Sequence, residues 1–443
     1  MAAWHHGAPT RETHVMARRL VPGPKTTSWG YLGISLNNVL YTVNAYVPAR
    51  RNRLLYAPSF FASWITIELA WFHLIWQVAL TGVAAALGAF RHRPGRIGLA
   101  LMVANWVGLA VTIKHSIDAR REIHEAFVDL RHERGAAKGL PVTVTRNIAY
   151  QRVAGKELRL DIWAPATPPA DGERRPALVQ IHGGGWTIGD KREQGRLIMK
   201  KMASEGWVCC NVNYRLSPGA TFPDHLVDCK RAVAWLRQHA DEYGIDPGFI
   251  AVTGGSAGGH LAALVALTAA DPSLQPGFED ADTSVQAAVP FYGVYDFTNR
   301  NGGWPADTLR LFIEPIVMKA YLADEPERFA QASPLDQVHA DAPPFLVIHG
   351  DRDTLAPLVD ARDFVARLRA VADQPVYYLE LHGAQHAFEI FPSLRAGRVI
   401  DAAAHFLDAV HTAYLASGHE LDPATVEAEV DAELGDLDAP VVS

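Results

Sequence analysis

Two glycine-rich stretches, His182-Gly183-Gly184-Gly185-Trp186 and Gly254-Gly255-Ser256-Ala257-Gly258, decide the fold of this chain. The second has the Gly-x-Ser-x-Gly pattern of a sharp turn between a strand and a helix, which holds a serine hydroxyl clear of the backbone. The first offers bare backbone N–H groups that suit a developing oxyanion. Together they predict acyl transfer to a serine.

The composition limits the number of domains and the kinds of partner and cofactor that the chain can have. With 443 residues the chain is long enough for two or three units, and its net charge of −7 argues against a nucleic-acid partner. The three cysteines, Cys209, Cys210 and Cys229, imply no disulfide framework. No C-x-x-C or H-E-x-x-H pattern suggests a metal, so we expect neither a metal nor a cofactor.

From residue 141 to residue 416 the sequence alternates between short apolar runs and helical segments. This alternation predicts an α/β domain with a mostly parallel sheet and helices on both of its faces. An antiparallel hairpin leads into it at Val142–Ile148 and Leu158–Trp163. The further strands are expected at Ala177–Ile181, Val208–Val212, Ile250–Thr253, Ala287–Phe291, Phe345–Ile348 and Val376–Leu381.

A serine hydroxyl becomes a good nucleophile only when a base takes its proton, and that base must be oriented by a third group. In sheet enzymes with this turn the chain order is serine, acid, histidine. Two late strand ends supply such groups, at 349–353 (His-Gly-Asp-Arg-Asp) and 382–386 (His-Gly-Ala-Gln-His). The residues alone leave Asp351, Asp353 and Asp296 open as the acid.

From 141 to 416 the chain resembles the α/β-hydrolase esterases and lipases, in particular the hormone-sensitive-lipase-like and feruloyl-esterase-like carboxylesterases. The resemblance rests on five ordered motifs at compatible spacing, which is far more specific than a lone Gly-x-Ser-x-Gly. They are the 182–186 run, Tyr214-Arg215-Leu216 with Phe222-Pro223, the 254–260 run, Gly350-x-x-Asp353 and Gly383-x-x-His386-x-Phe388. Gly255 stands where many bacterial members carry an acidic residue, which favours the feruloyl-esterase-like branch.

The resemblance implies a role for each matching residue. Ser256 would be the nucleophile, His386 the general base and then acid, and Asp353 its orienting partner. The backbone N–H groups of Gly184, Gly185 and Ala257 would form the oxyanion hole. The N-terminal cap helices usual in this family are not evident, so the roof of the acyl pocket is left open.

The first quarter of the chain predicts a transmembrane helical hairpin over residues 59–113. No Asp, Glu, Lys or Arg occurs from Leu69 to Ala89 or from Ile97 to Ile113, and a short basic turn lies between these runs. About 20 apolar residues cross a hydrocarbon layer of about 30 Å. A pair of buried core helices is the alternative interpretation. His73 and Gln77, one helical turn apart, are placed to face the partner helix.

The polarity of the segments that flank the hairpin and the α/β domain predicts their state. Residues 1–58 contain Trp29–Val47, which is either a third span or an interfacial segment. Residues 114–140 read as an amphipathic connecting helix, and residues 417–443, which carry no Lys or Arg, as an acidic disordered tail. We expect location in the membrane, most simply the cell membrane, with the side of the catalytic domain undetermined because the positive charges are balanced.

The sequence therefore favours a membrane-anchored serine carboxylesterase or lipase acting on a small-molecule or lipid ester. Hydrolysis of an amide, as by a formamidase or a peptidase, is a second possibility on the same fold. A catalytically silent binding module is a third, although such proteins normally lose a catalytic or oxyanion residue and this chain keeps all of them.

Overall fold

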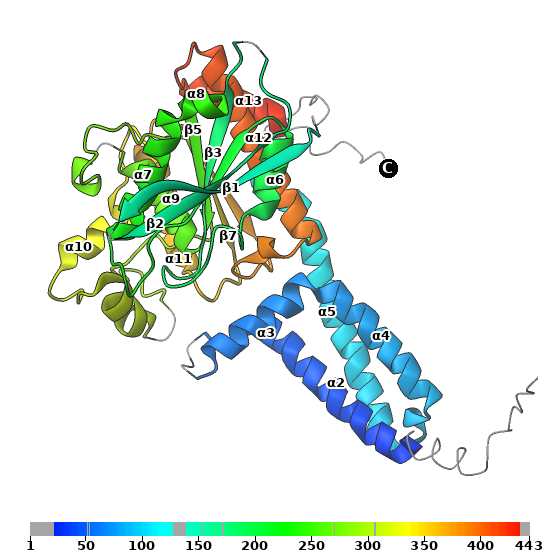
Figure 1. Ribbon diagram of the computed structural model, residues 1–443. Helices are drawn as coiled ribbons and strands as arrows, with labels where there is room; N and C mark the ends of the chain where they lie inside the picture. The colour runs from blue at the N-terminus through cyan, green and yellow to red at the C-terminus, as the bar shows by residue number, and fades with distance from the viewer. Residues whose placement is uncertain are drawn as a thin grey trace, which may run out of the picture. The chain divides into compact units, whose positions relative to one another are not determined.

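A computed structural model describes residues 22–126 and 139–434, apart from positions 51, 53, 154, 171, 270, 305 and 306. The chain divides into two compact units, which are considered separately below (Figure 1). One unit contains residues up to Pro48 together with Phe61–Lys114, and the other contains Ala49–Phe60 together with everything from His115 onward.

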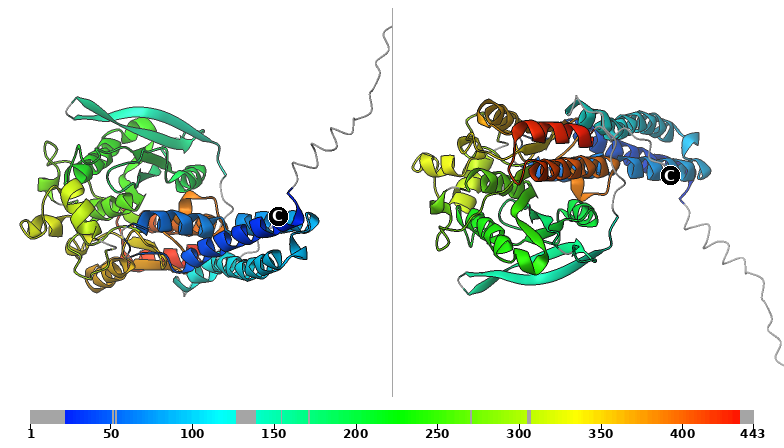
Figure 2. Two further views of the ribbon diagram at one scale, coloured as in Figure 1. Left: turned by 90° about the horizontal axis from the view of Figure 1, so that it is seen from below. Right: turned by 90° about the horizontal axis from the view of Figure 1, so that it is seen from above.

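The larger unit is built on an eight-stranded sheet in the order β1-β2-β4-β3-β5-β6-β7-β8. The β1–β2 and β2–β4 pairs are antiparallel and all the others are parallel, which confirms the predicted fold class. The strands are β1 Val142–Val153, β2 Lys156–Pro165, β3 Arg175–Ile181, β4 Val208–Val212, β5 Ile245–Gly255, β6 Ala287–Phe291, β7 Phe345–Gly350 and β8 Val376–Leu381. Figure 2 shows β1 and β2 as a long hairpin at the edge of the sheet.

Helices cover both faces of this sheet, as expected for short buried strands with apolar residues on each side. One face carries α7 Asp224–Gln238, α9 Ala257–Leu267 and α11 Leu358–Val371, and the other carries α6 Arg196–Ser204, α12 Leu394–Ala416 and α13 Pro423–Leu434. The neighbours Cys209 and Cys210 on β4 are buried in opposite cores because successive side chains of a strand point to opposite faces. The short helices α8 Ala240–Tyr243 and α10 Pro326–Gln331 lie in the connections.

The connection after β6 is longer than an ordinary crossover. Besides α10 it contains a π-type helical segment, Leu309–Met318, with Pro315 inside it. A proline has no N–H to donate to the preceding turn, which fits a wider winding at this point. This segment contributes to the wall of the pocket described below.

The smaller unit is helical. It contains α2 Pro24–Tyr46, α4 Ala70–Ala86, most of α3 Tyr56–Glu68 and the first part of α5 Arg93–Ala126. Among the described residues, α5 is by itself long and apolar enough to cross a membrane, and α3 and α4 pass the same test jointly although they are bent by 82° at Leu69. A short helical turn, Ala89–Arg91, precedes α5.

Two expectations about the flanking segments need correction. Residues 115–126 are not a separate connecting helix but continue α5, since neither glycine nor proline interrupts the chain there. The rest of the expected helix, 127–138, lies outside the described residues. The acidic segment after Ser417 is not wholly disordered, because it contains α13. Val426 and Val430, four residues apart, form a buried apolar stripe on α13, which lies beside α12 (Figure 2, right, in red).

Candidate active site

Ser256 lies at the turn between β5 and α9, with φ 59° and ψ −122°. Few residues with a side chain adopt this backbone conformation, and such strain is concentrated at functional sites. The N–H of Ser256 donates to the carbonyl of Phe291 at 3.0 Å, and the first turn of α9 begins at its own carbonyl. Gly258 is required here because a Cβ at that position would collide with the carbonyl of Ile181.

The glycine run at 182–186 forms the loop that follows β3, in front of this turn. Gly184 has φ 116° and Gly185 has φ 58°, so both adopt conformations that favour glycine. The N–H of Gly183 is already used, because it donates to Oε1 of Gln194 at 2.7 Å. Among the three glycines, this leaves the amides of Gly184 and Gly185 as the candidates for an oxyanion.

His386 and Asp353 come from loops after different strands and are in direct contact. Nδ1 of His386 lies 2.6 Å from Oδ2 of Asp353, and both side chains are almost completely buried. Since a carboxylate can only accept, Nδ1 carries the proton and Nε2 is the nitrogen left with a lone pair. The other oxygen of Asp353 accepts from the N–H groups of Leu355 and Ala356, at 2.7 and 2.8 Å.

The environment of Asp353 favours its charged form. Burial by itself would raise the pKa of this carboxyl, but the hydrogen bonds of His386 and His349, and the positive charge of these rings when protonated, outweigh burial and hold the pKa well below its ordinary value. Nε2 of His349 lies 3.3 Å from Oδ2 of Asp353. His349 therefore acts on the acid and not on the serine, in agreement with its position at the end of β7.

The other candidate acids are engaged elsewhere. Oδ2 of Asp351 lies 2.6 Å from Nδ1 of His382, and its Oδ1 accepts from the N–H of Gly383. Asp296 accepts from the backbone of Thr298 and Arg300 in its own loop. The structure thus brings Asp353 to His386 and leaves Asp351 and Asp296 in local contacts.

Two further histidines shape the loops around the serine. Nδ1 of His182 bonds to the carbonyl of Gly183 at 2.7 Å, and its ring stacks on Tyr214. The indole N–H of Trp186 donates to Nδ1 of His260 at 3.2 Å, while Nε2 of His260 donates to the carbonyl of Ala332 at 2.7 Å. Burial lowers the pKa of His260 to about 3, so this ring is neutral and ties three segments together.

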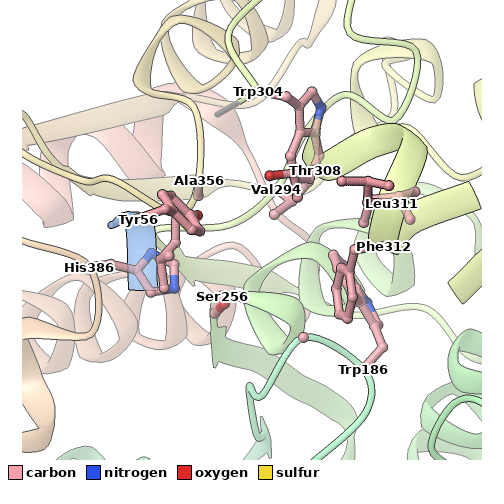
Figure 3. A pocket seen from close by; sticks show the side chains of 13 residues that line it. Tyr56, Trp186, Ser256, Val294, Trp304, Thr308, Leu311, Phe312, Ala356 and His386 are labelled. Carbon is pink, nitrogen blue, oxygen red and sulfur yellow. The ribbon is translucent and has the colours of Figure 1, made fainter. Parts of the chain in front are cut away.

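Ser256 and His386 line one pocket of about 360 Å³ (Figure 3). Its remaining walls are largely apolar or aromatic, and no group of three or more His, Cys, Asp or Glu able to hold a metal occurs in the part of the chain that is described. The other lining residues are Tyr56, Gly185, Trp186, Val294, Trp304, Thr308, Leu311, Phe312, Ile313, Leu355 and Ala356.

Sequence reasoning missed the aromatic residues on the pocket wall. Tyr56 projects toward His386 from the segment that precedes the first apolar run, and Trp304 and Phe312 project from the long connection after β6 (Figure 3). The ring of Phe60 also lies 6.3 Å from the His386 ring in an edge-on contact. No spacing rule links Tyr56 or Phe60 to His386 across more than 300 residues.

The chain is similar to known esterases. The BD-FAE family model matches residues 160–368. The chain is 38% identical over 427 residues to the probable carboxylic ester hydrolase LipM of Mycobacterium tuberculosis, covering 89% of this chain and 96% of LipM. It is 46% identical to esterase LipQ of the same organism over 281 residues, covering 63% of this chain and 64% of LipQ.

Among solved structures, the apo form of Thermogutta terrifontis esterase 2 aligns with a TM-score of 0.50 and 27% identity. That alignment covers 65% of this chain and 98% of the esterase. The LipM alignment covers 89% of this chain, which is more than the catalytic unit alone, so it reaches into the N-terminal region.

Proposed function

This chain belongs to the BD-FAE family of esterases within the α/β-hydrolase fold and is a carboxylic ester hydrolase, and we propose that it works through a Ser256–His386–Asp353 triad while anchored in a membrane. The contact of 2.6 Å between His386 and Asp353, at a pocket that Ser256 also lines, is the observation that carries the catalytic part. The anchoring part rests on the helices of the smaller unit.

In the proposed reaction Ser256 Oγ attacks the ester carbonyl while Nε2 of His386 takes the hydroxyl proton. Asp353 keeps the imidazole in the tautomer that can accept this proton and stabilises the imidazolium that forms. The N–H groups of Gly184, Gly185 and Ala257 surround the oxyanion, and each such donor is worth about 3 kcal/mol in the transition state. His386 returns the proton to the leaving alcohol, and a water then releases the acyl group by the same steps.

The pocket supports an acyl ester with an apolar acyl chain as the substrate class. Val294, Leu311 and Phe312 offer apolar surface, and the volume of about 360 Å³ is at the lower end of ordinary ligand sites. Charged side chains are absent from the lining among the described residues, which disfavours substrates whose acyl part carries a charge.

Exposed apolar side chains on α4 and α5 support membrane anchoring. Large hydrophobic residues face outward, while the polar Gln77 and Asn105 are buried and bonded to each other at 2.8 Å. Only 28% of the most apolar window of α5 is buried, which argues against the alternative of soluble core helices. The exposed residues include Trp71, Phe72, Ile75, Trp76, Val83, Ile97, Val103, Val107 and Val111.

The catalytic proposal is tested on the full-length protein with a fluorophosphonate probe and a panel of acyl esters and amides. The probe should label the wild type and should not label Ser256→Ala. It should label His386→Ala at no more than a small fraction of the wild-type rate. Labelling of Ser256→Ala at the wild-type rate, or a preference for N-formyl amides over every ester, would contradict it.

Anchoring is tested separately, by extracting membranes of expressing cells with alkaline carbonate. The proposal expects the protein to stay in the pellet and to dissolve only in detergent. Release into the supernatant would contradict the membrane part and leave the catalytic part untouched.

A further inference from the structure

We propose that α2 is a third transmembrane span, so that the chain crosses the bilayer an odd number of times and its N-terminal end and its catalytic domain are on opposite sides. This inference rests on the membrane anchoring proposed above. It concerns the helix that the sequence left open between a span and an interfacial segment.

The length and charge of α2 are those of a span although its composition is not conspicuously apolar. From Thr26 to Tyr46 no Asp, Glu, Lys or Arg occurs. A helix rises about 1.5 Å per residue, so these 21 residues extend over about 30 Å, the thickness of a bilayer's hydrocarbon core. Composition alone does not select α2 because its polar residues lower the mean hydropathy.

Those polar residues lie on the inner face of the helix bundle. Ser28, Ser35, Asn38 and Thr42 are buried and recur at intervals of three, four and seven residues, the spacing of one helix face. The outward side chains from Trp29 to Val47 are apolar except Asn37; Trp29 is 59% exposed and Leu40 67%. A helix lying at the interface would show the opposite pattern, with its polar face toward water.

The contacts of α2 run along the whole length of the predicted span in α5. At one end the N–H of Gly95 donates to Oγ of Ser28 at 2.6 Å. At the other end the hydroxyl of Tyr46 donates to the carbonyl of Gly108 at 2.7 Å and lies 3.1 Å from Oγ1 of Thr112. A helix that is in register with α5 from end to end must cross whatever layer α5 crosses.

Close packing and a polar cluster fix α2 in this register. A Cβ on Gly98 would come within 3.1 Å of the backbone of Leu32, so the two helices approach closely, as small residues allow in membranes. At mid-length, Nδ2 of Asn105 donates to Oε1 of Gln77, and Nε2 of Gln77 donates to Oδ1 of Asn38 at 3.2 Å. These two hydrogen bonds join α2, α4 and α5 away from water and give the amides partners that lipid could not supply.

The connection after α2 gives an independent constraint. Ala49–Phe60 belongs to the catalytic unit, and its Tyr56 lines the pocket with Ser256. This connection is therefore on the same side as the catalytic domain, in keeping with a chain that leaves through α4 and returns through α5. A single crossing by α2 then puts Gly23 on the opposite side, together with the turn at Ala89–Arg91.

Single cysteines and a membrane-impermeant maleimide test this topology in sealed vesicles that contain the full-length protein. The native cysteines are completely buried, so labelling reports the introduced ones. We would place Gly23→Cys before α2, His92→Cys before α5, Leu54→Cys in the connection and Lys156→Cys on the catalytic domain. All four positions are exposed.

The expected result is that Gly23→Cys and His92→Cys label from one side, and Leu54→Cys and Lys156→Cys from the other. If Gly23→Cys labels from the same side as Lys156→Cys while His92→Cys labels from the other, α2 does not cross and the inference is wrong, although the hairpin stands. If carbonate releases the protein, the anchoring proposal itself fails and the third span fails with it.

Discussion

The buried carboxylate of Asp353 accepts a hydrogen bond from Nδ1 of His386, whereas its close neighbour Asp351 is paired with His382. Two acid–histidine pairs thus lie side by side in the sequence, and only one of them includes a residue that lines the pocket with Ser256. A substitution of Asp353 therefore tests the proposed catalytic pair, and the same substitution of Asp351 is its matched control.

Replacing Asp353 by Asn should lower kcat for an activated ester by about 10³- to 10⁴-fold, because the amide no longer fixes the tautomer of His386. Asp351→Asn should change kcat less than about tenfold, since His382 is outside the pocket. Steady-state kinetics of both variants, with melting curves to show that they are folded, check this. Equal losses in the two variants would remove Asp353 from its proposed role.

Tyr56 should help to set acyl-chain preference because its ring forms part of the pocket wall. Tyr56→Ala should change the ratio of kcat/KM between long and short acyl esters by about tenfold, the usual effect of one apolar pocket contact. Tyr56→Phe keeps the ring and should leave the ratio unchanged. An unchanged ratio in Tyr56→Ala would mean that this residue does not touch the acyl chain.

Gly108 should be essential for the packing of α2. A Cβ there would come within 2.8 Å of Cγ2 of Thr42, whereas a Cβ on Gly82 would meet nothing within 4 Å. Gly108→Leu should therefore lower the melting temperature of the detergent-solubilised protein, with Gly82→Leu close to wild type. Similar melting temperatures for both variants would show that α2 and α5 are not packed in this way.

Asp360 should make stability depend on pH. Burial raises the pKa of this carboxyl to about 7, from an ordinary value of 3.8, and among the described residues its Oδ2 has no hydrogen-bond partner. A carboxyl with a raised pKa destabilises the fold as pH rises between those values, because the unfolded chain ionises first. At a pH below both pKa values the carboxyl is protonated in the folded and the unfolded chain, and this destabilisation disappears.

Asp360→Asn, which cannot ionise, should therefore melt at a higher temperature than wild type at pH 8, with the difference shrinking as the pH falls toward 4. The hydrogen bond from Asn301 to Oδ1 of Asp360 can be kept by the amide oxygen. Melting curves of the wild type and of Asp360→Asn across this pH range measure the difference. A constant difference at all pH values would show that ionisation of Asp360 is not responsible.

Local patterns in the sequence predicted the sheet well. The bounds of β4, β6 and β8 agree with the expected strands residue for residue, because short apolar runs between turn residues leave little freedom. The tail was misjudged because its acidic composition hid the Val426 and Val430 stripe, which becomes stable only against α12. The acidic composition predicted disorder there, and packing against α12 overrode it.

Sequence motifs predicted only those site residues that belong to short local patterns. Ser256, the glycine loop and the two strand-end clusters follow from local spacing, but the choice between Asp351 and Asp353 depended on a resemblance, since both follow Gly350. Tyr56 and Phe60 depended on a contact between distant segments, which no local pattern records. The polar residues of α2 stand in the sequence, but only their partners on α4 and α5 explain why these positions are polar.

The unusual backbone of Ser256 has a consequence for how this protein would respond to selection. A side chain held at positive φ costs on the order of 1 kcal/mol or more, and glycine at the same position would relieve it. Screening random variants for heat resistance alone should thus enrich Ser256→Gly, a variant that survives heating better and lacks the proposed nucleophile. A screen for variants of higher thermal stability must therefore measure esterase activity in the same round.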